Sequence, residues 1–287
     1  MNILRSKTRL LTLGLALMMG SGWLLSNAPK TPVLADEDED SNEAAIELLD
    51  QSHGYSPVLY DNTNGLPTSE ANAIVQTPEG FMWIGCYSGL IRYDGNTFER
   101  IDSAETGITS VVSLYVDSKE RLWVGTNDSG VGILEKGEWT TFTKQDGLPS
   151  ASVHDITEDE NGLIYLGTTA GVVLVDEELH LTHVVDPQIK DEYIRTLKMG
   201  YGNVAYGLTI DGAVFTMKDG KLVAFYSPKD LGVSDVHAIF PDPDKPDYVY
   251  YGTKGSDVYH GIPGQPLSKI IDTIEPFSYV NSIKKFD

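Results

Sequence analysis

Residues 121–126 of the chain read RLWVGT, and related segments occur at four other places. These are GFMWIG at 80–85, GLIYLGT at 162–168, NVAYGL at 203–208 and DYVYYGT at 247–253. Their glycines, Gly85, Gly125, Gly167, Gly207 and Gly252, are separated by 40, 42, 40 and 45 residues. A period of this length indicates an internal structural repeat.

Each repeat contains several short apolar segments separated by turn residues. In the second repeat, an apolar run ends at Leu114, residues 121–126 follow, residues 131–134 come next, and Lys136-Gly137 leads into residues 139–142. Segments of this kind, rich in β-branched and aromatic residues and bounded by Gly, Asp and Asn, are typical of strands. Four strands in every 40–45 residues indicate propeller blades, because solenoid repeats are generally shorter. We therefore predict an all-β fold, a β-propeller with four-stranded antiparallel blades, of which about five are complete.

The blade sequences are similar to a known family. Gly65-Leu66-Pro67 precedes the first blade, Gly147-Leu148-Pro149 precedes the third, and the second has the core Leu122-Trp123-Val124-Gly125-Thr126. This pattern resembles the two-component regulator propeller repeat over residues 56–287, closely in the first three units and weakly in the last two. The resemblance implies the extracytoplasmic sensor region of a longer receptor, followed by a membrane span and a histidine kinase, of hybrid type, or a diguanylate cyclase.

The last residues of the chain begin another repeat. Residues 279–287, YVNSIKKFD, match the innermost strand of a blade, as residues 152–156 do in the third repeat. A single strand would leave unpaired edges and an open ring. We therefore expect the first strand of a sixth blade here, and we expect this sequence to be an N-terminal fragment.

The first 55 residues have a different composition. Residues 1–35 hold four basic and no acidic residues around an apolar stretch from Leu10 to Leu25, which predicts a signal peptide cut after Ala35. An uncleaved membrane anchor is the alternative, although the stretch is short for a span. Residues 36–55 are predicted to be a flexible acidic spacer, and residues 56–287 the partial propeller. Export to the periplasmic or extracellular face of the cell envelope follows.

Charge and composition exclude several classes of protein. The net charge is −21, and it becomes −25 once residues 1–35 are removed, so sequence-independent binding to nucleic acid is excluded. The single cysteine, Cys86, excludes an internal disulfide framework and a cysteine-rich zinc site. It stands where later repeats have threonine, and we predict that it is buried and unreactive.

One variable position near the start of each inner strand carries the candidate binding residues. Several polar side chains there could ring the mouth of the central channel, joined by a tyrosine from the loop after the first glycine motif. The predicted ligand-binding residues are Asn72, His154, Arg195, His237, Asn281 and Tyr87. The alternative is ordinary polar lining, satisfied by water and backbone.

Chemistry beyond binding is not indicated by any motif. No nucleophile elbow, zinc-binding His-Glu-x-x-His or phosphate loop occurs, so we expect no catalytic residues and no cofactor. His154 and His237 are too few for a metal site, so no metal is expected.

Three functions remain after these exclusions. The leading hypothesis is a ligand-sensing region with a small-molecule or glycan ligand, and this segment is then not an enzyme. A secreted propeller enzyme acting on polysaccharide and a cell-envelope interaction scaffold are the alternatives. A homodimer through a missing C-terminal region stays open, and membrane contact is expected only through a missing downstream segment or the uncleaved leader.

Overall fold

The computed structural model describes residues 58–63, 65–68, 70–255, 257–271 and 280–284. The predicted signal peptide, residues 1–35, and the whole predicted acidic spacer, residues 36–55, lie outside these residues. The chain divides into two compact units, with residues 15–69 in one and residues 70–287, together with 1–14, in the other. In the described part of the first unit, the Leu66 N–H donates to the carbonyl of Asp61 at 3.0 Å, which closes a turn.

From Glu70 onward the described chain forms five four-stranded sheets, each antiparallel and each built from four consecutive strands. The first is β1 (Ala73–Gln76), β2 (Met82–Cys86), β3 (Gly89–Tyr93) and β4 (Phe98–Arg100). The second is β5 (Val111–Val116), β6 (Leu122–Thr126), β7 (Val131–Glu135) and β8 (Glu138–Phe142). The third is β9 (Val153–Glu158), β10 (Ile164–Thr168), β11 (Gly171–Val175) and β12 (Leu181–His183). The fourth is β13 (Ile194–Gly200), β14 (Val204–Thr209), β15 (Val214–Lys218) and β16 (Lys221–Tyr226), and the fifth is β17 (Val236–Pro241), β18 (Val249–Thr253), β19 (Val258–Gly261) and β20 (Ser268–Ile271).

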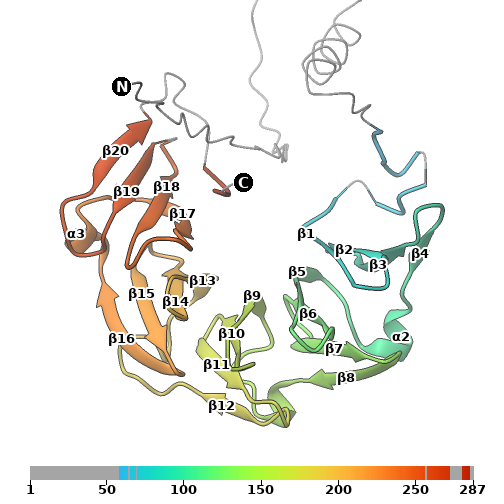
Figure 1. The fold of residues 1–287 in the computed structure, drawn as a ribbon. Helices are drawn as coiled ribbons and strands as arrows, with labels where there is room; N and C mark the ends of the chain where they lie inside the picture. Colours follow the sequence, from blue (N-terminus) through green and yellow to red (C-terminus); the bar gives the residue numbers. More distant parts are fainter. Residues whose placement is uncertain (1–57, 64, 69, 256, 272–279, 285–287) are drawn as a thin grey trace, which may run out of the picture. The chain divides into compact units, whose positions relative to one another are not determined.

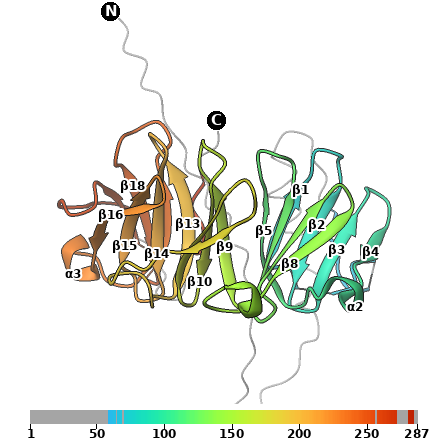
Figure 2. The same ribbon diagram turned by 90° about the horizontal axis from the view of Figure 1, so that it is seen from below.

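The sheets follow one another as blades around a common centre within this unit. Their first strands, β1, β5, β9, β13 and β17, are neighbours from one blade to the next and lie on the inner side (Figure 1). Figure 2 shows the same blades turned by 90°, with their strands running along a common direction. The predicted all-β propeller with four-stranded antiparallel blades is therefore confirmed.

Short helical turns connect some of the blades on the outside. The turns are α2 (Ser103–Thr106), α3 (Pro228–Leu231) and the single 3₁₀ turn Lys144–Asp146. Each starts at a residue whose side chain caps the first backbone N–H groups, as Ser227 does for Asp230 at the start of α3. No helix of the described residues is long and apolar enough to cross a bilayer.

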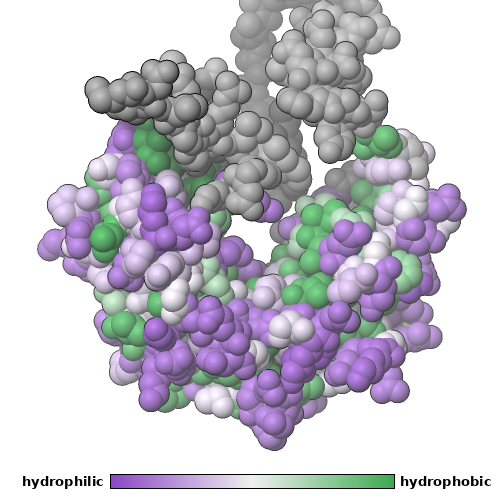
Figure 3. All heavy atoms as spheres, viewed as in Figure 1, coloured by the Kyte–Doolittle hydropathy of each residue, from purple (hydrophilic) through white to green (hydrophobic). Residues whose placement is uncertain are grey.

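The hydrophobic core lies between neighbouring blades rather than inside any one of them. Trp123 of the second blade, for example, packs in one buried cluster with Val153 and Leu166 of the third. The first blade has neighbours on one side of its described sheet only, and Ile74 on β1 is 64% exposed. Figure 3 shows apolar surface over the first blade near β1. The apolar runs of the sequence thus become strands buried by adjacent sheets.

The glycine of the repeat motif is required by the contact between blades. A Cβ at Gly85 would lie 2.5 Å from Cγ1 of Val111, the first residue of the next inner strand. A Cβ at Gly167 would lie 2.9 Å from Cγ2 of Ile194, which is the same contact one blade further on. A side chain at this position would therefore push the next blade away.

The motif threonine has a separate role inside its own blade. Thr126 and Thr168 each donate a hydroxyl hydrogen bond at 2.8 Å to a carbonyl of the following turn, on Gly130 and Gly171. Cys86 takes this place in the first blade and is fully buried, as the sequence predicts. Burial raises the pKa of its thiol to about 11.

In the fourth blade the motif is shifted by one residue from its predicted position. Ile194 pairs with Thr209, as Val153 pairs with Thr168, so Leu208 rather than Gly207 takes the place of the motif glycine. Leu208 is fully buried and packs in one cluster with Val236 of the next blade. Gly207 is needed for another reason, because a Cβ there would overlap the ring of Phe215.

Residues 280–284 lie against the fifth blade at the position of a following inner strand. The Val280 side chain sits over Gly252, as Val111 sits over Gly85, and its N–H donates to the Thr253 carbonyl at 3.2 Å. Val280 and Ile283 pack with Val258 in a small apolar cluster. This placement agrees with the first strand of a sixth blade, although these five residues form no strand pairing themselves.

Candidate ligand-binding site

The variable position near the start of the inner strand is a β-bulge in four consecutive blades. The register against the second strand slips by one residue there, and the extra residues are Val112, His154, Arg195 and His237. A bulge leaves its extra residue out of the regular ladder and turns its side chain in a new direction. The bulges thus free these side chains from the alternation that buries their neighbours between the blades.

His154 is stacked on a tyrosine that the sequence analysis did not select. The ring centroids of His154 and Tyr193 are 4.5 Å apart, with 22° between the ring planes. The Tyr193 hydroxyl lies 3.4 Å from Nδ1 of His154. Tyr193 directly precedes β13 and lies two residues before Arg195, and this position beside a predicted binding residue was the available signal.

Arg195 contacts the bulge residue of the next blade. Its Nη1 donates to Nε2 of His237 at 3.3 Å, a contact that requires Nε2 to be an acceptor and the imidazole to be neutral. Burial lowers the pKa of His154 and of His237 below the usual value, and the Arg195 charge lowers both further. Neutral imidazoles therefore flank a single guanidinium.

We call these four side chains the rim cluster: His154 contacts Tyr193, Arg195 contacts His237, and the charge of Arg195 lowers the pKa of His154. All four are half-buried. Two of their nitrogens, Nε2 of His154 and Nε of Arg195, are buried and have no hydrogen-bond partner among the described residues. Both nitrogens are therefore buried polar groups whose hydrogen bonding the described residues leave unsatisfied.

The other three predicted residues have different surroundings. Asn72 donates its side-chain amide to the carbonyl of Val111 at 2.9 Å, so it ties the first two blades together. Tyr87, in the turn between β2 and β3, is 45% exposed. Asn281 is exposed and lines a separate cavity with Thr196 and Lys198.

Potential metal ligands gather elsewhere. Among the described residues, Asp176, Glu178 and His180 hold ligand atoms within 4.8 Å of one another, in the exposed hairpin between β11 and β12. Asp176 accepts hydrogen bonds there from the backbone and the ring of His180, at 2.8 and 3.1 Å. This group serves the turn, and it includes neither His154 nor His237.

Comparison with known sequences identifies the repeats. The two component regulator propeller model matches residues 65–88, 107–128 and 147–170. The chain carries two component regulator propeller repeats. The matched segments fall in the first three blades, and His154 lies in the third of them.

Known proteins with similar sequences or folds include signalling proteins and an enzyme. A histidine kinase of Formosa agariphila is 31% identical over 107 residues, 36% of this chain, and the chain spans only 8% of its length. A chain described as the extracellular domain of a hybrid two component system of B. thetaiotaomicron matches with a TM-score of 0.63 at 15% identity, over 79% of this chain and 33% of that one. A streptogramin B lyase matches with a TM-score of 0.59 at 18% identity, over 74% of this chain and 71% of that one. At these identities the two structural likenesses show a shared fold for the propeller repeats and nothing about their ligands.

Proposed function

We propose that this chain is the ligand-sensing propeller region of an exported signal-transduction receptor, and that the rim cluster contacts the ligand. The propeller repeats and the fold shared with an extracellular two component system domain support the receptor assignment. The histidine kinase of Formosa agariphila is much longer than this chain, which fits a sensor region that is joined to an output domain. The observation that carries the binding proposal is the convergence of His154, Tyr193 and Arg195 on the bulged side of the inner strands.

The rim cluster combines two kinds of contact that suit a polar ligand such as a glycan. The stacked His154 and Tyr193 rings offer flat apolar faces to the C–H surface of a sugar ring. Arg195 offers N–H donors, and a neutral imidazole offers one donor and one acceptor to hydroxyl groups. Groups of this kind fix the orientation of a small molecule without performing chemistry on it.

Binding at the rim cluster is tested with the full chain. The protein is screened against oligosaccharides and small polar metabolites by thermal shift, and hits are titrated calorimetrically into the wild type and into His154→Ala and Arg195→Ala. Each variant should bind at least about tenfold more weakly, because each loses a ligand contact worth about 1.4 kcal/mol.

The control is His180→Ala, which removes a 75% exposed imidazole from the distant β11–β12 hairpin and should leave the affinity unchanged. Unchanged affinity in both rim variants would place the ligand elsewhere. A library without any stabilising compound would count against ligand sensing itself.

The receptor assignment has its own experiment. The coding sequence downstream of Asp287 is read in the source genome, and a membrane-spanning segment followed by a kinase or cyclase domain is expected. An immediate stop codon, confirmed at the protein level by mass spectrometry, would contradict the receptor assignment and favour the scaffold.

A second candidate is an enzyme, favoured by the likeness to a lyase over most of both chains. In that case a neutral His154 beside Tyr193 would act as a general base. Mass spectrometry of each hit after incubation with the protein separates the two candidates. Unchanged compound supports binding alone, whereas turnover lost in His154→Ala supports catalysis.

A further inference from the structure

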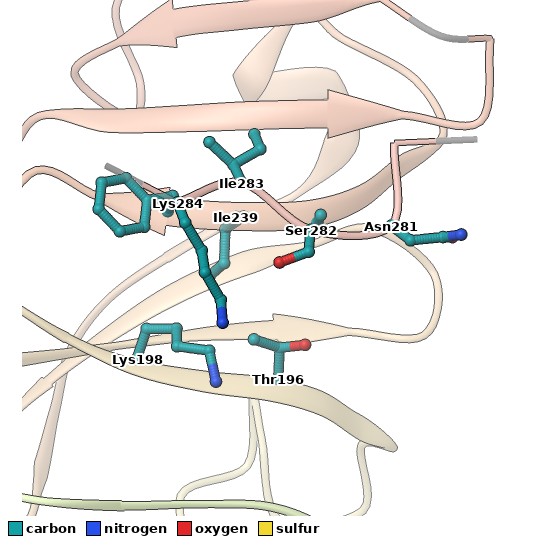
Figure 4. A pocket seen from close by; sticks show the side chains of 9 residues that line it. Thr196, Lys198, Ile239, Asn281, Ser282, Ile283 and Lys284 are labelled. Atoms are coloured by element: carbon teal, nitrogen blue, oxygen red, sulfur yellow. The ribbon is translucent and has the colours of Figure 1, made fainter. Parts of the chain in front are cut away.

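A second concave site lies beside the rim cluster, between β13, β17 and residues 280–284. It is a cavity of about 490 Å³, and its polar lining comes from Thr196 and Lys198 of β13 and from Asn281, Ser282 and Lys284. Figure 4 shows the amino ends of both lysines and the hydroxyls of Thr196 and Ser282 around one space. We call this site the channel pocket. Its volume falls within the range of small-molecule sites.

The charge of the channel pocket is opposite to that of the protein. The chain has 42 acidic and 21 basic residues, yet the charged residues lining this pocket are both lysines. Two ammonium groups facing one space repel each other and attract an anion. The composition of the chain would favour acidic residues here, so this cationic lining is a specific feature of the site.

Asp155 holds one of the two lysines in place without cancelling both charges. Its carboxylate accepts a hydrogen bond from Nζ of Lys198 at 2.8 Å and from the Leu197 N–H at 2.9 Å. The side chain of Asp155 is 18% exposed, whereas that of Lys198 is 48% exposed, so the ammonium group still reaches the pocket. Lys284 has no acidic partner among the described residues, so the three groups together carry one excess positive charge.

The remaining wall of the channel pocket is apolar. Ala238, Ile239 and Phe240 of β17 and Ile283 of the last segment line it. A bare inorganic ion would leave this wall facing water, whereas an organic anion would cover it and gain from the burial. The hydroxyls of Thr196 and Ser282 can hydrogen-bond to the polar groups of such a molecule.

We propose that the channel pocket binds a small organic anion, with Lys284 and Lys198 contacting its carboxylate or sulfate group. An acidic saccharide has this chemistry. The inference rests on the proposed ligand-sensing function and adds the chemical class of the ligand to it.

The test compares disaccharides of similar size and different charge with a bare inorganic anion. Digalacturonic acid, a monosulfated disaccharide, neutral digalactose and sodium sulfate are each titrated calorimetrically into the full chain. At least one acidic disaccharide should bind about tenfold more tightly than digalactose, as expected for one additional charge contact. Its affinity should fall as salt is added, because ions screen exposed charges. The two acidic probes distinguish a carboxylate from a sulfate ligand, and sodium sulfate reports on the charge alone.

Variants locate the site. Lys284→Met should weaken binding of the acidic probe about tenfold. Lys198→Met should do the same, although it also leaves Asp155 without its ammonium partner. The control is Lys229→Met on α3, an exposed lysine outside the pocket, which should bind like the wild type. Melting temperatures of all variants show whether each one is folded.

The outcomes separate this inference from the proposed function. Equal affinity for the acidic probes and digalactose would overturn the anionic class while leaving ligand sensing intact. Full affinity in Lys284→Met and Lys198→Met would overturn the channel pocket as the site. The absence of binding by either acidic disaccharide at millimolar concentration would also overturn the inference, whereas ligand sensing is judged by the rim-cluster experiment.

Discussion

Replacing Asp117 by asparagine tests the buried ion pair at the hairpin between β5 and β6. The Asp117 side chain is fully buried, and that of Arg121 is 3% exposed. The carboxylate accepts from Nε of Arg121 at 2.5 Å, from Nε1 of Trp123 at 2.7 Å and from the N–H groups of Lys119 and Arg121 at 3.0 and 2.8 Å. Asparagine removes the charge and turns an NH₂ group toward at least one of these donors.

The expected loss follows from the fate of Arg121. Removing one partner of a buried pair leaves the other charge uncompensated and costs about 3–5 kcal/mol. For a unit of this size that corresponds to a melting temperature lowered by about 6–20 °C. Urea unfolding followed by tryptophan fluorescence measures the free energy of unfolding directly, because Trp123 contacts the altered group.

Two control variants bracket this result. Glu99→Gln removes the charge from an exposed pair, in which Arg92 and Glu99 side chains are 37% and 57% exposed, and should cost less than about 1 kcal/mol. Asp159→Asn changes the same repeat position in the third blade, where the carboxylate accepts hydrogen bonds from Tyr165 and from backbone N–H groups but pairs with no arginine among the described residues. This variant should lower the free energy of unfolding by about 1–3 kcal/mol. A loss below about 1 kcal/mol for Asp117→Asn would refute the reasoning, because Arg121 would then be hydrated in solution.

Further predictions concern the glycine motif, the cysteine and the buried imidazoles. Gly125→Ala should lower the free energy of unfolding by about 1–3 kcal/mol, because the added Cβ would lie 2.6 Å from a backbone carbonyl of the third blade. Gly255→Ala is the control: its Cβ would have one atom within 4 Å, so the same urea unfolding experiment should show almost no change. Cys86→Thr should raise the free energy of unfolding by about 1 kcal/mol by restoring the hydroxyl bond of the other blades, and equal stability of the two proteins would contradict this. The Cys86 thiol, with a pKa raised to about 11 by burial, should react with Ellman's reagent only in denaturant, so rapid reaction of the folded chain would contradict the burial argument. The pKa values of His154 and His237 are lowered from 6.5 in the folded chain, so the unfolded chain binds more protons than the folded chain as the pH decreases. The free energy of unfolding should therefore fall as the pH decreases below about 6.5. The double variant His154→Gln/His237→Gln should show a smaller fall in urea titrations at several pH values.

Much of the blade architecture could be predicted from the sequence because each blade is a local structure. Strand partners within a sheet are consecutive in the chain, so strand segments and turn residues repeat with the blade. The burial of Cys86 was predictable for the same reason, since it occupies the place of Thr126 and Thr168. The fourth blade shows the limit of this reasoning. Gly207 matches the motif in the sequence, but the strand pairing places Leu208 where the other blades have the motif glycine, and Gly207 lies against the Phe215 ring instead.

The candidate site was predictable only as a set of positions. The repeat pointed to His154, Arg195 and His237, but their equivalence did not show that they would be in contact with one another. The structure places Arg195 in contact with His237 and His154 in contact with Tyr193, while it assigns Asn72 to a contact with the second blade. These relations depend on side chains about forty residues apart meeting across a blade boundary, which no local pattern records.

The sequence by itself determined the number and order of the described blades and the acidic character of the chain. It could do so because strand pairing and turn formation depend on residues close together in the chain. Only the tertiary structure decided which polar side chains converge, which become structural, and that two lysines face one cavity in an acidic protein. Those outcomes are set by the packing of one blade on the next, where bulges and the contacts of Leu208 and Val280 fix the direction of each inner strand.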